Sequence, residues 1–157
     1  MTYSELPTRL TVDSSVLVKA LAPPRRRKDD EMYRHQLSLH HRALEIFEDI
    51  IRKNKTMFIP SIVLVEVAAV ISRITNSRED AYEAVEKIRK HSHRVLSDSD
   101  ILDSAIATAV ETKASGFDNI VLACTRLTGS ALITEDLKLH RIAEEHGIES
   151  YLLRELI

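Results

Sequence analysis

The sequence has little of several residue types that define whole classes of proteins. Its 157 residues include one cysteine, no tryptophan and three glycines, and aromatic residues make up 4%. A single thiol excludes a disulfide within the chain, which fits the reducing cytoplasm where we expect the protein to act. Cys124 stands in an apolar run and is expected to be a small buried hydrophobic residue. The core has to be built from aliphatic side chains.

Long apolar runs are also missing. No stretch approaches the roughly 20 apolar residues that span a bilayer, and the first ten residues, MTYSELPTRL, lack the apolar segment of a signal peptide. We therefore expect no membrane association. Hydrophobic residues make up 44% of the chain and charged residues 29%, as in ordinary globular proteins. At this length the simplest prediction is one domain over residues 1–157.

The chain lacks an excess of charge of either sign, because its net charge is −2. It therefore has no overall basic field to attract nucleic acid. Positive charge is concentrated in the segment PPRRRK, residues 23–28. Such a run is usually a solvated surface. The alternative is an arm that contacts a phosphate backbone through Arg25, Arg26, Arg27 and Lys28.

Short apolar segments alternate with helical patterns along the chain. Strands are predicted at 9–12, 56–59, 93–97, 130–134 and 148–152. Helices are predicted at 14–21, 36–53, 61–74, 79–91, 100–113, 118–129 and 136–146, with the charged residues 25–35 as a loop. Ser61 is the expected N-cap of its helix, and Gly116 is expected to end the helix before it.

Strands separated by helices predict an α/β fold with parallel β-α-β units. We expect a three-layer α/β/α sandwich with a central parallel sheet of four to five strands. Ligands in such folds collect at the carboxyl ends of the strands.

Four acidic residues stand where that edge is predicted. Asp13 and Asp136 follow the first and fourth strands, Glu66 lies in the helix after the second strand, and Asp118 begins a later helix. If the first and fourth strands are neighbours, the four carboxylates meet and repel one another. Mg²⁺ or Mn²⁺, which prefer oxygen ligands, would neutralise them.

Each aspartate also has a purely structural explanation as a helix N-cap, worth about 1 kcal/mol. Glu66 does not, because it stands within IVLVEVAAVI, an apolar helix where a carboxylate without a partner is costly. This residue favours a functional cluster.

Four segments resemble the successive motifs of PIN-domain ribonucleases, including VapC-type toxins: LTVDSSVLVKAL, IPSIVLVEVAAVI, GFDNIVLACT and LITEDLKLHRIA. The resemblance runs from about Arg9 to the C-terminus. It implies that the four acidic residues bind one or two Mg²⁺ or Mn²⁺ ions. It also implies supporting hydroxyl groups at Ser15 and Thr134, and makes Glu135 a neighbour of the site.

The activity implied by the resemblance is hydrolysis of phosphodiester bonds in single-stranded or loop RNA, which leaves a 5′-phosphate and a 3′-hydroxyl. An antitoxin partner and a homodimer, formed through apolar helices within residues 61–91, are further implications. The chain departs from the compact family pattern in its long charged segment between Pro23 and Gln36. This departure leaves the choice of RNA open.

The other acidic and histidine residues have simpler explanations. Asp98, Asp100 and Asp103 follow the third strand, and the spacing of Asp100 and Asp103 favours helix capping. His35, His40 and His41 lack partners at zinc-ligand spacing, and they, with His91, His93 and His140, are expected to be solvated.

Three other functions share parts of the pattern. A haloacid-dehalogenase-type phosphatase requires an aspartate where Ser15 stands, and a receiver domain requires an acidic pair where only Asp13 follows the first strand. The third is a PIN fold without catalysis that binds RNA or protein. Retention of all four acids argues against that one.

Overall fold

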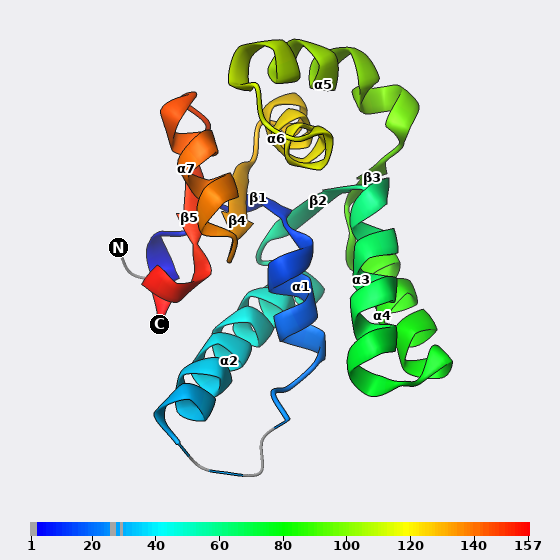
Figure 1. Ribbon diagram of the computed structural model, residues 1–157, viewed down its shortest axis with the longest axis vertical. Helices are drawn as coiled ribbons and strands as arrows, with labels where there is room; N and C mark the ends of the chain where they lie inside the picture. Colours follow the sequence, from blue (N-terminus) through cyan, green and yellow to red (C-terminus); the bar gives the residue numbers. More distant parts are fainter. Residues whose placement is uncertain (1–2, 26–27, 29) are drawn as a thin grey trace.

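The computed structural model describes residues 3–25, 28 and 30–157. Over these residues one parallel sheet is formed, with the strand order β3-β2-β1-β4-β5 (Figure 1). Its strands are β1 (Arg9–Val12), β2 (Thr56–Pro60), β3 (Arg94–Leu96), β4 (Ala131–Thr134) and β5 (Ser150–Leu152).

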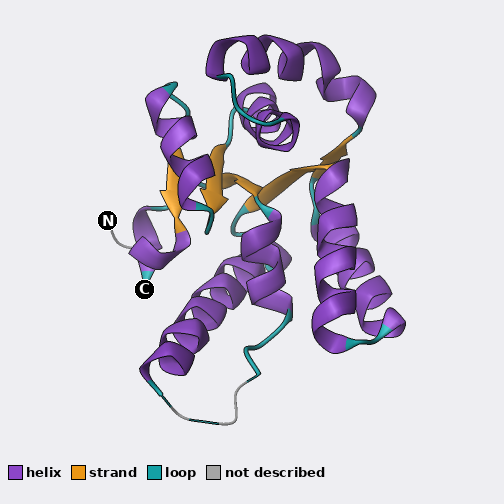
Figure 2. Cartoon of the chain, in the orientation of Figure 1, coloured by secondary structure: helices purple, strands orange, loops and turns teal. Residues whose placement is uncertain are grey.

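Helices connect the strands and surround the sheet, as the colouring by secondary structure shows (Figure 2). They are α1 (Ser14–Leu21), α2 (Glu31–Ile51), α3 (Ser61–Thr75), α4 (Arg78–His91), α5 (Asp98–Thr112), α6 (Gly116–Thr128) and α7 (Leu137–Glu145), with short 3₁₀ turns at Tyr3–Glu5 and Leu153–Leu156. None of the helices in the described ranges combines the length and the apolar character needed to cross a bilayer.

The two faces of the sheet have separate cores, because successive side chains of a strand point to opposite faces. On one face, Leu10 and Val12 of β1 pack in a cluster with residues of α1, α2, α3 and α4. On the other face, Phe58 of β2 packs with α5 and α6, and Leu132 of β4 packs with α6 and α7. The predicted α/β/α sandwich with a parallel sheet is confirmed.

The order of the strands in the sheet reverses at β1, which is the switch point between β2 and β4. β2 and β3 extend the sheet on one side of β1, whereas β4 pairs with β1 on the other side, with Val12 opposite Ile133. The Asp13 N–H continues this pairing by donating to the Ile133 carbonyl at 3.0 Å. Crevices at such switch points are the usual ligand sites of open parallel sheets.

The predicted start of the second helix was wrong. Residues 31–35 were expected in a loop, but α2 begins at Glu31. The Asp30 side chain caps it by accepting the Tyr33 N–H at 2.8 Å. These first residues are mostly exposed, so they carry no apolar periodicity. The N-cap sets the start of this helix, and the apolar pattern begins only later.

Other predicted helix ends were also wrong. Ser61 is the first residue of α3, and Pro60 precedes it as the N-cap. Ser97, rather than Asp100, caps α5, with Asp100 at the third helical position in a reciprocal capping box. The same helix ends at Thr112, with Lys113 as its C-cap at φ 58°, so Gly116 begins α6 instead of ending α5.

The prediction for one histidine was wrong. His140 was expected to be solvated, but its side chain is buried on α7, beside the Ser150 hydroxyl at 2.8 Å. Its position on the inner side of an amphipathic helix, next to the buried Leu139, explains the burial.

Candidate active site

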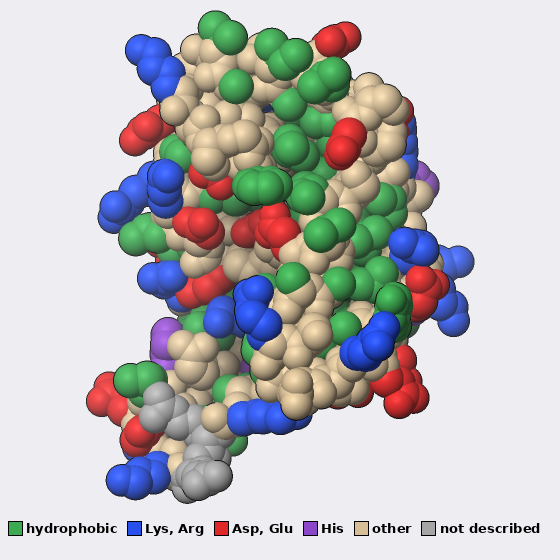
Figure 3. All heavy atoms as spheres, turned by 45° about the vertical axis from the view of Figure 1, so that its right-hand side comes forward, with side chains coloured by type: hydrophobic (Ala, Val, Ile, Leu, Met, Phe, Trp, Pro, Cys, Tyr) green, Lys and Arg blue, Asp and Glu red, His purple; other side chains and the backbone are tan. Residues whose placement is uncertain are grey.

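A cleft of about 540 Å³ opens where β1 and β4 end. Its lining includes all four acidic residues singled out in the sequence: Asp13, Glu66, Asp118 and Asp136. They come from the end of β1, the middle of α3, the first turn of α6 and the end of β4. In Figure 3 acidic side chains gather at the middle of the face shown, with hydrophobic side chains around them.

Asp13 is the most buried of these acids, with 7% of its surface exposed. Its Oδ2 atom accepts hydrogen bonds from the Ser15 and Thr134 hydroxyl groups, each at 2.8 Å. Burial raises the pKa of the Asp13 carboxyl, and nearby Asp136 adds to the increase, while the Thr134 and Ser15 hydroxyls and the Ser14 backbone oppose it. A buried carboxylate next to other acids attracts cations.

Thr134 connects the two strand ends. It is fully buried at 0% exposure, and its hydroxyl accepts the Asp136 N–H at 3.0 Å while donating to Asp13. Ser15 forms the parallel link, because its hydroxyl accepts the Glu135 N–H at 3.0 Å. The structure thus places both predicted hydroxyl groups against Asp13, and they fix the loop after β4 to the start of α1.

Glu66 is half-buried, not enclosed in the apolar core as its sequence surroundings suggest. Its Oε2 atom accepts a hydrogen bond from the Ser14 hydroxyl at 2.5 Å. Ser14 was not among the predicted site residues. The signal available was its position next to Asp13, but contact with Glu66 depends on how α1 and α3 pack, which no local pattern records.

Asp118 and Asp136 both stand at helix starts. Asp118 is at the third position of α6, which is capped by Ser115. Asp136 caps α7, its Oδ1 atom accepting the Lys138 and Leu139 N–H groups at 2.9 and 3.1 Å. Asp136 is therefore a helix N-cap, as its structural explanation proposed. This capping role does not compete with a functional one, because the same carboxylate lines the cleft.

Glu135 is not among the residues that line the cleft. Its carboxylate forms an ion pair with Arg154, with the Nε and Oε1 atoms 2.8 Å apart, and accepts the Arg154 N–H at 2.9 Å. Of the two adjacent acids at the end of β4, Glu135 therefore has a structural partner and Asp136 lines the cleft. This agrees with the expectation that Glu135 is a neighbour of the site.

Two of the acids after β3 have structural partners, and Asp100 belongs to the capping box of α5. Asp100 accepts the Ser97 N–H at 2.9 Å, and this hydrogen bond is the largest cause of its lowered pKa. Asp98 accepts the Ser61 hydroxyl at 3.2 Å. Neither is among the residues that line the cleft, and both follow β3, an edge strand of the sheet.

The basic segment lies apart from the acids. Arg25 and Lys28 are exposed between α1 and α2, so they follow the end of α1 opposite to Asp13 (Figure 1). Arg26 and Arg27 fall outside the described residues. Contact with RNA through this segment stays a prediction.

The carboxylate oxygens suit a hard divalent ion by their chemistry. Among the described residues, however, no three Asp, Glu, His or Cys side chains are grouped closely enough to hold one ion in this conformation. Mg²⁺ usually keeps several waters and is bound through only one or two carboxylates. The donor set therefore fits Mg²⁺ or Mn²⁺, and the ligand roles of the four acids stay predictions.

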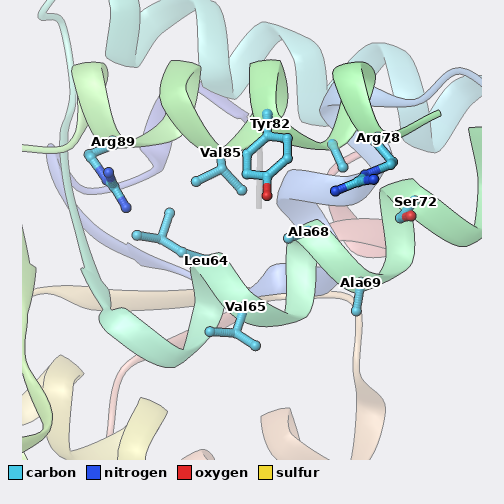
Figure 4. Close-up of a pocket in the computed structure, with 10 residues that line it drawn as sticks. Leu64, Val65, Ala68, Ala69, Ser72, Arg78, Tyr82, Val85 and Arg89 are labelled. Carbon is cyan, nitrogen blue, oxygen red and sulfur yellow. The ribbon is translucent and has the colours of Figure 1, made fainter.

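A second pocket, of about 500 Å³, lies between α3 and α4 (Figure 4). Its walls are mostly apolar, with Leu64 and Val85 facing each other in the figure, and Arg78 and Arg89 stand at its ends. Its lining has no acid or histidine that could activate the hydroxyls of Ser72 or Tyr82, so it resembles a contact surface more than a catalytic site. Val65 also lines the acidic cleft, which makes the two depressions neighbours.

Comparisons with solved structures give the same fold at low sequence identity. VapBC2 from Rickettsia felis, solved bound to a DNA fragment from its promoter, is 15% identical, with a TM-score of 0.59 over 92% of this chain and 98% of that one. FitAcB from Neisseria gonorrhoeae is 11% identical, with a TM-score of 0.59 over 94% and 99%. PAE2754 from Pyrobaculum aerophilum is 18% identical, with a TM-score of 0.55 over 91% and 83%.

Comparison with curated protein sequences gives no match. The family profile described as the PIN domain, in contrast, matches residues 10–145. This range begins inside β1 and ends with α7, so it includes every element that contributes to the acidic cleft. The chain therefore belongs to the PIN domain family.

Proposed function

We propose that this protein is an endoribonuclease that uses Mg²⁺ or Mn²⁺ to hydrolyse phosphodiester bonds in single-stranded or loop RNA. The observation that carries the proposal is the convergence of four carboxylates on one cleft at the switch between β1 and β4. Membership of the PIN domain family and the resemblance of the motifs support the reaction class.

The electrostatics of the cleft support a role for cations. RNA carries a negative charge at every phosphate, and the cleft carries further negative charge, so the two repel each other without a cation between them. When bound, the ion lowers the pKa of a coordinated water and stabilises the charge that builds up on the phosphate. Asp13, Glu66, Asp118 and Asp136 would hold it there.

The remaining polar groups would keep these carboxylates in place. The hydroxyls of Thr134 and Ser15 hold Asp13 in one orientation and favour its ionised form, since each donates to the same oxygen. The Ser14 hydroxyl restrains Glu66 in the same way. Such support matters because catalytic groups have to be positioned within a fraction of an ångström.

A nuclease assay tests the proposal. Single-stranded RNA is incubated with the purified protein and Mn²⁺ or EDTA, and the product ends are identified. We expect cleavage in Mn²⁺ and none in EDTA, with products that carry a 5′-phosphate. Asp13→Asn should lose cleavage. Asp100→Asn, which changes a helix cap outside the cleft, is the matched control and should cleave normally. RNA binding without cleavage would instead favour the non-catalytic PIN module.

We also propose that the protein acts in the cytoplasm as the toxin of a toxin–antitoxin pair. The common fold with VapBC2 and FitAcB supports this role, and the apolar pocket between α3 and α4 offers a surface for a protein partner. Ile74 and Tyr82 are exposed on the same helices, so this surface is also suited to the contact between the two subunits of the predicted homodimer.

Induced expression in a bacterial host tests the toxin role. Growth should stop with the wild-type protein and continue with Asp13→Asn produced at the same level. Unimpaired growth with active wild-type enzyme would favour an RNA-processing role.

A further inference from the structure

Phe117 is an aromatic residue that the fold does not use. The chain has three phenylalanines. Phe47 and Phe58 are buried in the two cores, with 1% and 4% of their surfaces exposed, whereas 59% of Phe117 is exposed. Among the described residues, the hydrophobic clusters do not include it. A large apolar side chain left in water beside other exposed apolar groups is typical of a binding surface.

The position of Phe117 indicates which ligand this surface would bind. It is the second residue of α6, directly before Asp118, and it lines the same cleft as the four acids. The inner side of α6 is formed by later residues such as Val121 and Leu122, which are buried against β4 and α7. The helix therefore holds Phe117 at the rim of the cleft independently of the core.

A second group of apolar residues in the lining of the cleft comes from α3. Val65 on α3 has 63% of its surface exposed, and Ile62 and Ala69 of the same helix line the cleft beside it. The lining of the cleft thus combines four acids with an aromatic residue on α6 and a short aliphatic surface on α3. Charge beside exposed apolar side chains suits a ligand that combines phosphate with flat rings.

We propose that Phe117 stacks on a base of the single-stranded RNA whose phosphate is held at the acids, an inference that rests on the proposed function. Every phosphate within a strand has a base on each side, so an aromatic residue next to the acids lies within reach of one. Stacking on an aromatic side chain is available to every base, because each has a π-face. Phe117 therefore contributes affinity with little sequence preference.

This contact also selects against duplexes. A base inside a double helix already stacks on its neighbours, and bringing it onto Phe117 requires that this stacking be broken, at a cost of a few kcal/mol. A base in a single strand or a loop is free of that cost. The residue thus explains in physical terms why the cleft should take unpaired RNA.

Binding measured without cleavage tests the proposal. The Asp13→Asn protein is mixed with Mn²⁺ and a fluorescently labelled single-stranded RNA, and its Kd is compared with that of the Asp13→Asn/Phe117→Ala double variant. Loss of one stacked base should raise the Kd roughly 5- to 150-fold. Phe117→Trp, which keeps an aromatic face, should retain binding. Val110→Ala is the matched control, since Val110 is 75% exposed on α5, outside the cleft.

An RNA of the same length with abasic nucleotides separates stacking from other causes. It should bind equally to the Asp13→Asn protein and to the double variant that also carries Phe117→Ala. An equal loss of affinity on both RNAs, or no loss on either, would overturn the inference.

Cleavage by the wild-type protein is measured separately, which distinguishes this inference from the proposed function. A nuclease that binds RNA normally after Phe117→Ala refutes the stacking contact and leaves the proposed function standing. A protein that binds RNA through Phe117 but never cleaves it refutes the proposed function alone.

Discussion

Replacing Thr134 with valine tests the hydrogen-bond network around Asp13 most sharply. The two side chains have the same shape, so Thr134→Val removes the hydroxyl and leaves the packing of a fully buried site intact. Three hydrogen bonds are lost: the one donated to the Asp13 Oδ2 atom at 2.8 Å, the one accepted from the Asp136 N–H at 3.0 Å and the one shared with the Ser15 hydroxyl at 3.3 Å.

The hydrogen bond to Asp13 determines how much stability Thr134→Val loses. A hydrogen bond to a charged group contributes about 1.5–3 kcal/mol, compared with about 0.5–1.5 kcal/mol for a neutral one. Because the Thr134 hydroxyl lowers the pKa of Asp13 against the effect of burial, its loss raises that pKa further. An acid whose pKa is higher in the folded protein destabilises the fold when ionised. The added cost is therefore largest at neutral pH and disappears as the pH falls through the folded-state pKa.

Urea unfolding in EDTA measures this cost, with Thr125→Val as the matched control. Thr125 is equally buried, but its hydroxyl donates to the Val121 carbonyl at 2.9 Å within α6. We expect Thr134→Val to be the more destabilising change at neutral pH and the difference to shrink in acid. Equal losses for the two variants at all pH values would refute the network as described.

Three further predictions concern the metal and the RNA. Mn²⁺ at about 100 times its Kd should stabilise the folded protein by about 2.7 kcal/mol, and an unchanged melting temperature would argue against a metal site. Ser14→Ala should weaken Mn²⁺ binding in calorimetry by freeing Glu66, and Ser14→Thr should restore it; equal affinity in all three proteins would contradict a positioning role. Alanine at residues 25–27 should weaken RNA binding and flatten its salt dependence, whereas unchanged binding would identify a solvated loop.

The convergence of the acids was predictable from the sequence. The carboxyl ends of parallel strands lie at one edge, so Asp13 and Asp136 had to meet once β1 and β4 were neighbours. The hydroxyls of Thr134 and Ser15 beside Asp13 were expected from the resemblance to PIN-domain ribonucleases instead. The positions of residues at strand ends can be predicted because backbone pairing between neighbouring strands determines them.

Contacts between helices were not predictable in this way. The hydrogen bond from Ser14 to Glu66 depends on the packing of α1 against α3, and the exposure of Phe117 depends on which side of α6 meets the sheet. Both are tertiary outcomes of core packing. The early start of α2 was missed for a different reason, since its first turns are exposed and held by the Asp30 cap.

The central claim is that the acidic cleft binds metal for RNA cleavage, and Glu66→Gln tests it most directly. Glutamine keeps the shape of the side chain and an oxygen that can accept from Ser14, but it removes one charge from the cluster. The measurement is a Mn²⁺ titration combined with cleavage of single-stranded RNA by the wild-type protein and the variant. We predict that Mn²⁺ affinity and cleavage fall together, cleavage most, while the metal-free variant is as stable as the wild type or more stable. Full cleavage by Glu66→Gln would contradict the claim.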